Sequence, residues 1–190
     1  GLKGKKVCEI GCSYGNFLFR LKELGSGVSA VELDTEAVNF LKKEDIPVYD
    51  RIPISPKFDA ICAFNLLEHL ADPADLIKEA AGSLGHGGRL LLSLPNSGEI
   101  EKVGPWWVGF RVDLEHLNYF SVKSLGSLLI QYGFYIEHYY EYNQPSIFLN
   151  KGYSLFEKIN RIRKRILLKM FSAPFYEEGT FELTVLARKY

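Results

Sequence analysis

Residues 6–16 read KVCEIGCSYGN, and this stretch decides the fold. Its first five residues predict a short buried strand, and Gly11 and Gly15 predict a turn that leads into a helix. Further along, Val28 to Leu33 predicts a second strand, in which Glu32 follows Gly11 by 21 residues. A strand, a glycine turn, a helix and a second strand that ends in an acid are typical of one half of a doubly wound sheet.

The same alternation of apolar runs and helical patterns continues to about residue 95, which indicates an α/β fold with a parallel sheet covered on both faces. The strands that we expect in this half, after the first two, cover residues 47–49, 58–64 and 89–94. The expected helices cover residues 16–24, 35–43 and 73–84. Beyond Pro95 the pattern predicts a helix and two further strands, over residues 125–132, 134–142 and 180–188.

The chain has 190 residues, which is enough for one ordinary domain, and we expect a single domain over residues 1–190. Its 23 basic and 23 acidic side chains balance. Residues 1–150 nevertheless carry 14 basic and 19 acidic side chains, a net charge of −5, while residues 151–190 carry 9 and 4, a net charge of +5. The whole chain therefore lacks the strong positive field of a nucleic-acid-binding protein, and we expect no nucleic acid partner.

Three cysteines, Cys8, Cys12 and Cys62, form no CxxC pair, so neither a zinc site nor a disulfide framework is expected. A reducing compartment is the default for such a chain. No apolar run approaches the roughly 18 residues that a membrane span needs, and the first residues lack a signal-peptide core. We therefore expect a soluble, cytoplasmic protein.

The glycine turn also indicates which nucleoside ligand would fit. A dinucleotide fingerprint has the form GxGxxG, whose backbone amides close on a pyrophosphate. Here Gly11 and Gly15 give the form GxxxG, with Ser13 at the place of the second glycine. This spacing disfavours a nicotinamide dinucleotide and suits a nucleoside without phosphates whose amino-acid tail lies against the end of the first strand.

Four segments in order resemble the motifs of class I S-adenosylmethionine-dependent methyltransferases, in the small-molecule branch that includes ubiquinone-biosynthesis O-methyltransferases and many sugar and natural-product enzymes. The segments are residues 7–15, 58–73, 87–96 and 113–121, the last followed by residues 125–134, so the resemblance covers about residues 5–135. It implies a Rossmann-like sheet of seven strands, mostly parallel with the last strand antiparallel. It also implies S-adenosylmethionine as the cofactor and methyl transfer to a small-molecule acceptor, with a hydroxyl favoured.

The resemblance implies roles for three acids around the cofactor: Glu9 near its ammonium group, Glu32 on the ribose and Asp50 at the adenine amine. Asn65 and Leu66 would lie along the methionine and adenine side. The rest of the site would be shaped by Gly11, Cys12, Ser13, Gly15 and Leu33. Each role has a plainer alternative. Glu9 could be a structural carboxylate that anchors loop amides, Glu32 a surface acid, and Cys12 a small filler. Ser13 stands where many members have glycine, which could alter the turn.

Methyl transfer from a sulfonium is an in-line displacement, so positioning matters most and no nucleophilic residue is needed. For a hydroxyl acceptor, His116 is the candidate base and Asp113 could orient it. The alternative is that His116 caps the following turn and that Asp113 begins a helix. Glu68, His69 and His116 could instead hold a divalent metal. Because they lack a tight ligand spacing, we assign no metal from the sequence.

Residues 1–95 are expected to hold the cofactor and residues 96–190 to face the acceptor, with a helical insertion at about 150–175. Of the 26 aromatic residues, 19 lie beyond position 95. Trp106, Trp107 and Tyr119 could stack on a planar acceptor or simply pack the lid. The basic helix expected at Ser154 to Phe171 could be a lid, an interfacial helix on anionic lipid or a partner surface.

A different class of function stays open at this point. The domain could bind the cofactor without catalysis, as a regulatory or scaffolding subunit. Members of the branch usually carry helices before the first strand, so either the sequence is trimmed or another part of the protein covers the acceptor.

Overall fold

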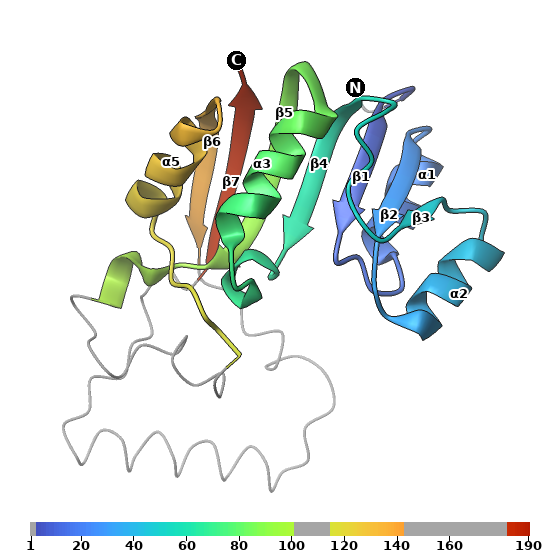
Figure 1. The fold of residues 1–190 in the computed structure, drawn as a ribbon, viewed down its shortest axis with the longest axis horizontal. Coiled ribbons are helices and arrows are strands. Elements are labelled where there is room, and N and C mark those ends of the chain that lie inside the picture. The colour runs from blue at the N-terminus through green and yellow to red at the C-terminus, as the bar shows by residue number, and fades with distance from the viewer. Residues whose placement is uncertain (1–2, 101–114, 143–181) are drawn as a thin grey trace, which may run out of the picture.

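The computed structural model describes residues 3–100, 115–142 and 182–190. Over these residues it shows one seven-stranded sheet in the order β3-β2-β1-β4-β5-β7-β6 (Figure 1). All neighbouring strands pair in parallel except β7, which runs antiparallel to both β5 and β6. The expected α/β class, the seven strands and the antiparallel last strand are confirmed.

The strands are β1 Lys6–Ile10, β2 Gly27–Val31, β3 Val48–Tyr49, β4 Phe58–Phe64, β5 Leu84–Pro95, β6 Phe134–Tyr142 and β7 Glu182–Lys189. The α-helices are α1 Asn16–Glu23, α2 Thr35–Lys43, α3 Pro73–Ser83 and α5 Val122–Gln131, and two short 3₁₀ helices are η1 Leu67–His69 and η2 Ser97–Glu99. The helix expected at Ser154 to Phe171 lies outside the described residues.

Several elements begin or end away from their predicted limits, each by a few residues. The fifth strand begins at Leu84 rather than at residue 89, because Leu84 pairs with Phe58 across a register irregularity. The helix expected at residue 125 begins at Val122. Ser121 and Ser124 form a capping box there, in which each side chain accepts the backbone N–H of the other. That cap satisfies two N–H groups of the first turn and fixes the earlier start.

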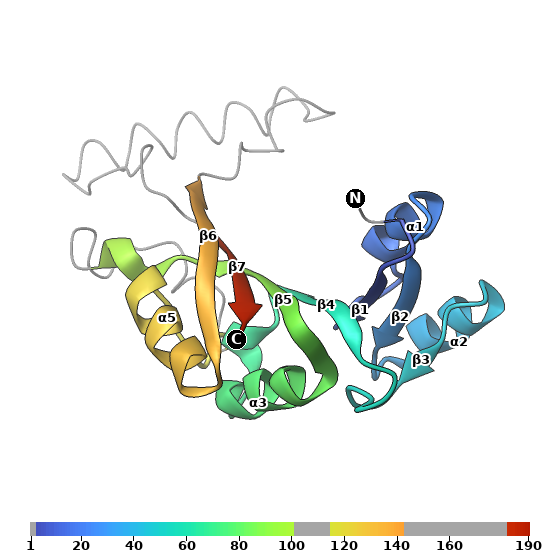
Figure 2. The same cartoon turned by 90° about the horizontal axis from the view of Figure 1, so that it is seen from above.

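The sheet has a separate apolar core on each face. Along β1, successive side chains point to opposite faces, so Val7 and Glu9 share one face while Cys8 and Ile10 share the other. Figure 2 shows α3 and α5 on one face of the sheet and α1 on the other. Cys8 and Ile10 belong to the core with α3 and α5, whereas Val7 packs with buried residues of α1 and α2. Glu9 is thus a carboxylate on an otherwise apolar sheet face.

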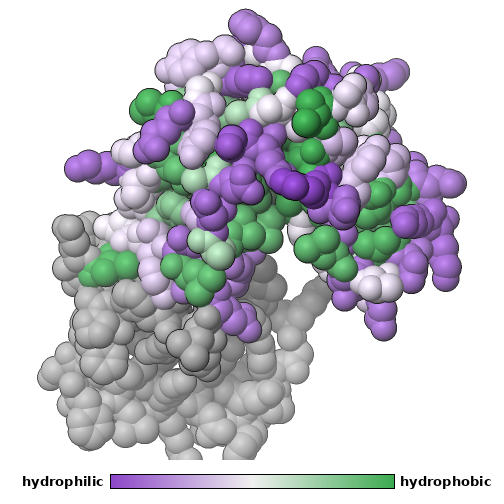
Figure 3. Space-filling view, in the orientation of Figure 1, coloured by the Kyte–Doolittle hydropathy of each residue, from purple (hydrophilic) through white to green (hydrophobic). Residues whose placement is uncertain are grey.

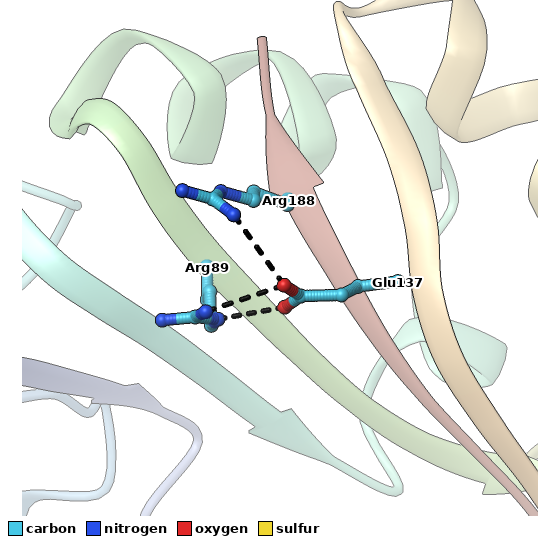
Figure 4. Close-up of polar contacts among 3 residues, drawn as sticks. All are labelled: Arg89, Glu137 and Arg188. Atoms are coloured by element: carbon cyan, nitrogen blue, oxygen red, sulfur yellow. Dashed lines mark hydrogen bonds and ion pairs between the residues drawn. The ribbon is translucent and has the colours of Figure 1, made fainter. Parts of the chain in front are cut away.

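Ion pairs join three strands at the edge where the parallel strands begin (Figure 4). Arg89 of β5 donates to both carboxylate oxygens of Glu137 in β6, from Nε at 2.7 Å and from Nη2 at 3.2 Å. Arg188 of β7 lies 3.5 Å from the same carboxylate. Glu137 is the extra residue of a bulge between Ile136 and His138. The bulge turns its side chain toward the two arginines.

The described surface in the view of Figure 3 is mostly hydrophilic, with hydrophobic groups gathered in separate patches. Among the helices of the described residues, none combines the length and the apolar character that a membrane crossing requires.

Candidate nucleoside-binding site

The strand order reverses between β1 and β4, which lie side by side in the middle of the sheet. In doubly wound sheets, ligands bind outside the carboxyl ends of the strands at such a switch point. Gly11 follows β1 and Asn65 follows β4, so both lie at this place. The Gly11 N–H donates to the Val31 carbonyl at 2.8 Å, which holds the glycine turn against the end of β2.

The turn contains three residues with left-handed backbone, Gly11 at φ 67°, Ser13 at φ 49° and Gly15 at φ 73°. At Gly15 an added Cβ would lie 2.6 Å from Leu41 Cδ2 of α2, so the close packing of the turn on α2 requires glycine. Ser13 takes the left-handed conformation although it is not glycine. The serine is therefore accommodated at a left-handed position of this turn.

Cys12 is buried within the turn, and burial raises the pKa of its thiol to about 12. A thiol with such a pKa stays protonated and is a poor nucleophile. Its Sγ donates to the Ser13 carbonyl at 3.5 Å. Cys12, Cys8 and Cys62 are all free and buried. This geometry agrees with Cys12 as a small filler.

Glu32 follows β2 and binds backbone amides on both sides of the site. Its Oε2 accepts the Ser13 N–H at 2.7 Å, and its Oε1 accepts the N–H groups of Leu33 at 2.8 Å and Asp34 at 3.0 Å. A carboxylate has about four acceptor positions, two on each oxygen. Oε1 is filled, and Oε2 has one position left, which is enough for one hydroxyl of a sugar without moving the turn.

Glu9 is the buried acid of the site. It is 5% exposed, and its Oε2 has no hydrogen-bond partner among the described residues. Burial and, to a lesser extent, the nearby Glu32 carboxylate raise its pKa to about 7. The interpretation of Glu9 as an anchor for loop amides accounts for neither the bare oxygen nor the raised pKa. A cationic group of a ligand would stabilise the ionised form.

The remaining cofactor candidates line the same edge. A Cβ on Gly11 would lie 3.3 Å from Leu66 Cδ1, so the Leu66 side chain forms a wall directly beside the turn. Asn65 has φ 47° and its N–H donates to the Ser93 carbonyl at 2.7 Å. Leu33 is 76% exposed beyond the end of β2, which leaves an apolar surface open to a planar ligand. Asp50 is exposed after β3, the edge strand.

The structure describes only some of the residues expected to contact the acceptor. Trp106, Trp107 and Asp113 lie outside the described residues. Tyr119 is 41% exposed. The rings of His116 and His69 meet edge to face with their centres 4.8 Å apart. His116 therefore lies beside the loop that follows β4.

Glu68 is the buried acid of the loop that follows β4, where a helix-start acid held by local backbone is the alternative to a functional role. It is 2% exposed, and neither of its carboxylate oxygens accepts a hydrogen bond from another described residue. Its backbone carbonyl accepts the N–H groups of Leu117 at 2.8 Å and Asn118 at 3.0 Å. Those contacts join the η1 loop to a segment about 50 residues later, which no local sequence pattern predicts.

Sequence reasoning missed a second polar group at the carboxyl end of β5. The buried Ser93 donates to Glu182 Oε1 at 3.2 Å and lies 3.1 Å from the Thr184 hydroxyl. The fully buried Asn96 donates from Nδ2 to Glu141 at 3.0 Å and accepts the Gly98 N–H at 2.9 Å. Polar residues inside the apolar run LLLSLPN were the available signal.

Comparison with known proteins agrees with this geometry. A family model described as a methyltransferase domain matches residues 1–139. A tRNA U34 carboxymethyltransferase of Campylobacter hominis is 34% identical over 108 residues, and a ubiquinone biosynthesis O-methyltransferase of Idiomarina loihiensis is 28% identical over 131 residues. These matches cover 48% and 62% of this chain, but only 36% and 51% of the two relatives.

A solved SAM-dependent methyltransferase from Archaeoglobus fulgidus has the same fold, with a TM-score of 0.66 and 19% identity. That match covers 98% of this chain and 86% of the other. At this identity the likeness concerns the fold, while the family match covers most of the chain. The chain belongs to the methyltransferase domain family.

Proposed function

We propose that this protein transfers a methyl group from S-adenosylmethionine to a small-molecule acceptor, with a hydroxyl favoured. One observation carries the proposal within the family: the Glu32 carboxylate holds the Ser13 amide at 2.7 Å while Oε2 keeps one free acceptor position. An acid at the end of β2, fixed to a glycine turn without the pyrophosphate spacing, fits the ribose of a nucleoside that carries no diphosphate.

The residues of the carboxyl edge divide the binding work. Glu32 would accept a ribose hydroxyl, and the open Leu33 side chain would lie against the base. Asp50 would reach the adenine amine, and the ionised form of Glu9 would hold the ammonium of the methionine part. Gly11 and Leu66 would shape the wall between them. When bound, S-adenosylmethionine supplies an electrophilic methyl group on a sulfonium sulfur.

On the acceptor side the histidines are the candidate bases. As the acceptor oxygen bonds to the methyl carbon and the carbon–sulfur bond breaks, the hydroxyl proton must leave. His116, whose ring contacts that of His69 near the end of β4, would take it. A positioned base of this kind contributes roughly 100- to 10,000-fold. The alternative of a cofactor-binding subunit without catalysis predicts no such dependence on His116.

A tRNA acceptor is the second candidate, because one relative is a tRNA U34 carboxymethyltransferase. Charge favours the small molecule. Residues 1–150 carry a net charge of −5, whereas binding to a phosphate backbone is supplied by lysine and arginine. A cytoplasmic location agrees with the free cysteines and stays a prediction.

Calorimetry with S-adenosylmethionine, S-adenosylhomocysteine and NAD tests the cofactor. We expect the first two to bind and NAD not to bind. Glu32→Gln should weaken binding by roughly 10- to 100-fold, since a hydrogen bond to a charged group is worth about 1.5–3 kcal/mol. Glu36→Gln, an exposed acid in the first turn of α2, is the matched control and should bind normally. Binding of NAD, or equal affinities for both variants, would contradict the proposal.

Methyl transfer itself is then tested with S-adenosylmethionine labelled on the methyl group. The acceptors are a panel of phenols, catechols and sugars, with bulk tRNA in parallel. Label on the small molecules supports the proposal, and label on tRNA alone replaces the acceptor class. Cofactor binding without transfer to any of them would favour the non-catalytic alternative.

A further inference from the structure

Three side chains with metal-binding atoms meet beside the end of β4. Each of Glu68, His69 and His116 offers one ligand atom, and these atoms all lie within 4.8 Å of one another. Two backbone hydrogen bonds to the Glu68 carbonyl fix the segment that carries His116, and Asn118 Nδ2 adds a third contact at 2.6 Å to the Leu70 carbonyl. The three side chains therefore come from two segments whose backbones are tied together.

Hydrogen bonding assigns the proton on His69. Its Nδ1 lies 2.8 Å from the Glu115 carbonyl oxygen, which can only accept, so Nδ1 carries the hydrogen. In the neutral ring Nε2 then presents a lone pair, and this atom lies 3.9 Å from Glu68 Oε1. Metal-binding histidines almost always donate their other N–H to a carbonyl or carboxylate in this way, which orients the ring.

The Glu68 carboxylate lies near that lone pair, and no hydrogen bond from another described residue offsets its negative charge. Both of its oxygens are buried and neither accepts a hydrogen bond from another described residue. Glu182, itself 6% exposed, adds a further negative charge in the vicinity. A buried carboxylate that faces an imidazole lone pair is unfavourable unless a proton or a metal ion lies between them.

We propose that Glu68, His69 and His116 bind one divalent metal ion of the zinc class. One carboxylate and two imidazoles suit zinc and neighbouring first-row metals better than magnesium or calcium, which prefer all-oxygen sites. Three protein ligands also leave a fourth position open. Ligand atoms about 2.1 Å from a tetrahedral ion lie roughly 3.4 Å apart, so the three atoms must draw together by about an ångström. His69, with one third of its side chain exposed, gives the ion a way in.

This metal site rests on the proposed function for its role. With the ion bound, His116 would be a ligand and not the base. The metal would then polarise an acceptor hydroxyl in the open position and lower the pKa of that hydroxyl, so that solvent water could take its proton. It would favour acceptors with two neighbouring oxygen atoms, which can fill the open position firmly. The sequence spacing of the three residues gave no sign of a site, because the third ligand lies 47 residues beyond the second.

The test is a titration of the metal-stripped full chain with Zn²⁺ by calorimetry and with Co²⁺ by visible absorption. We expect one ion per chain. Loss of a residue that merely orients a ligand costs 10- to 100-fold in affinity, so Glu68→Gln, which removes a ligand, should cost at least tenfold. His69→Gln should have a similar effect. The chain has four histidines, and the double variant His86→Asn, His138→Asn, which spares the cluster, is the matched control and should bind like the wild type.

Three results would overturn the metal site: no stoichiometric binding, equal affinity in Glu68→Gln, or loss of binding in the control variant. If Glu68 and His69 share a proton and bind no metal, the infrared spectrum should show a carboxylic acid band that Glu68→Gln lacks. Added metal should then leave that band unchanged, and this result would also overturn the metal site. Calorimetry with S-adenosylhomocysteine on the same samples separates the two proposals. Cofactor binding without metal binding overturns the metal site alone, and metal binding without cofactor binding overturns the proposed function.

Discussion

The two edges of the sheet treat their carboxylates in opposite ways. Where the parallel strands begin, Glu137 is paired with Arg89 and Arg188, and the hydrogen bond from Arg89 lowers its pKa. Where they end, Glu9 and Glu68 are buried and neither is paired with a cationic side chain among the described residues that would hold its pKa down, and burial raises the pKa of both. A paired acid holds strands together, whereas a buried unpaired acid costs stability and is typical of a site completed by a ligand.

The largest expected effect concerns a histidine at the carboxyl edge. His116→Ala should lower methyl transfer by at least roughly 100-fold while leaving the affinity for S-adenosylhomocysteine unchanged, because both a base and a metal ligand at this position act on the acceptor and not on the cofactor. His138→Ala on β6 is the matched control and should keep full turnover. The measurement is single-turnover transfer together with calorimetry. Unchanged turnover in His116→Ala would remove this residue from the mechanism.

The second effect is on stability, at Glu9. Because its pKa is raised from 4.5 to about 7 on folding, the neutral acid is favoured in the folded chain, and stability is lost as the pH rises from about 4.5 through 7. Glu9→Gln should therefore match the wild type near pH 4.5 and exceed its free energy of unfolding by roughly 3 kcal/mol at pH 8. Urea denaturation at several pH values measures this. A difference in free energy of unfolding between the two proteins that does not change with pH would contradict the raised pKa of Glu9.

The third effect is on cofactor affinity, again through Glu9. If the ammonium group of the ligand binds the ionised carboxylate, affinity should rise with pH through about 7. Between pH 6 and pH 8 the ionised fraction grows from about a tenth to about nine tenths, so the dissociation constant for S-adenosylhomocysteine should fall roughly tenfold. Glu9→Gln should bind more weakly at pH 8 and show no such rise. A flat profile in the wild type would separate Glu9 from the ammonium group.

The smallest effect is expected at the opposite edge. Glu137→Gln removes a charge from a surface ion-pair network, and exposed pairs add little to stability. We expect a small fall in Tm that vanishes at high salt, and no change in cofactor affinity. Arg89→Lys should act in the same direction, because lysine cannot donate to both carboxylate oxygens. A large loss of stability would mean that the comparison of the edges is wrong.

The part of the fold that the sequence predicts is the part set by short-range patterns. The limits of β1, α2, β4 and β6 follow from apolar runs between turn residues, and the GxxxG turn with Glu32 at 21 residues marks one edge of the sheet. The paired ends of β5 and the serine cap of α5 were missed, because pairing with Phe58 and the exchange between Ser121 and Ser124 depend on three-dimensional contacts.

In the candidate site, too, local patterns predict some residues, while others depend on contacts between distant segments. Glu9, Gly11, Glu32 and Leu66 come from the ends of strands whose order the pattern already implies, and the structure places them at one edge. The burial of Glu68 could not be predicted, since its backbone carbonyl binds the N–H groups of Leu117 and Asn118 from far along the chain. Burial of an acid by a distant segment is a property of the packed molecule and cannot be predicted from a local motif.

The most direct test is a crystal structure of the protein with S-adenosylhomocysteine. We predict the adenosine beside Gly11 and Leu66, with a ribose hydroxyl donating to Glu32 Oε2 while the Ser13 amide remains bound, and the amino group of the ligand next to Glu9. A ligand found elsewhere, or a Glu32 carboxylate that contacts only the amides of Ser13, Leu33 and Asp34, would contradict the account.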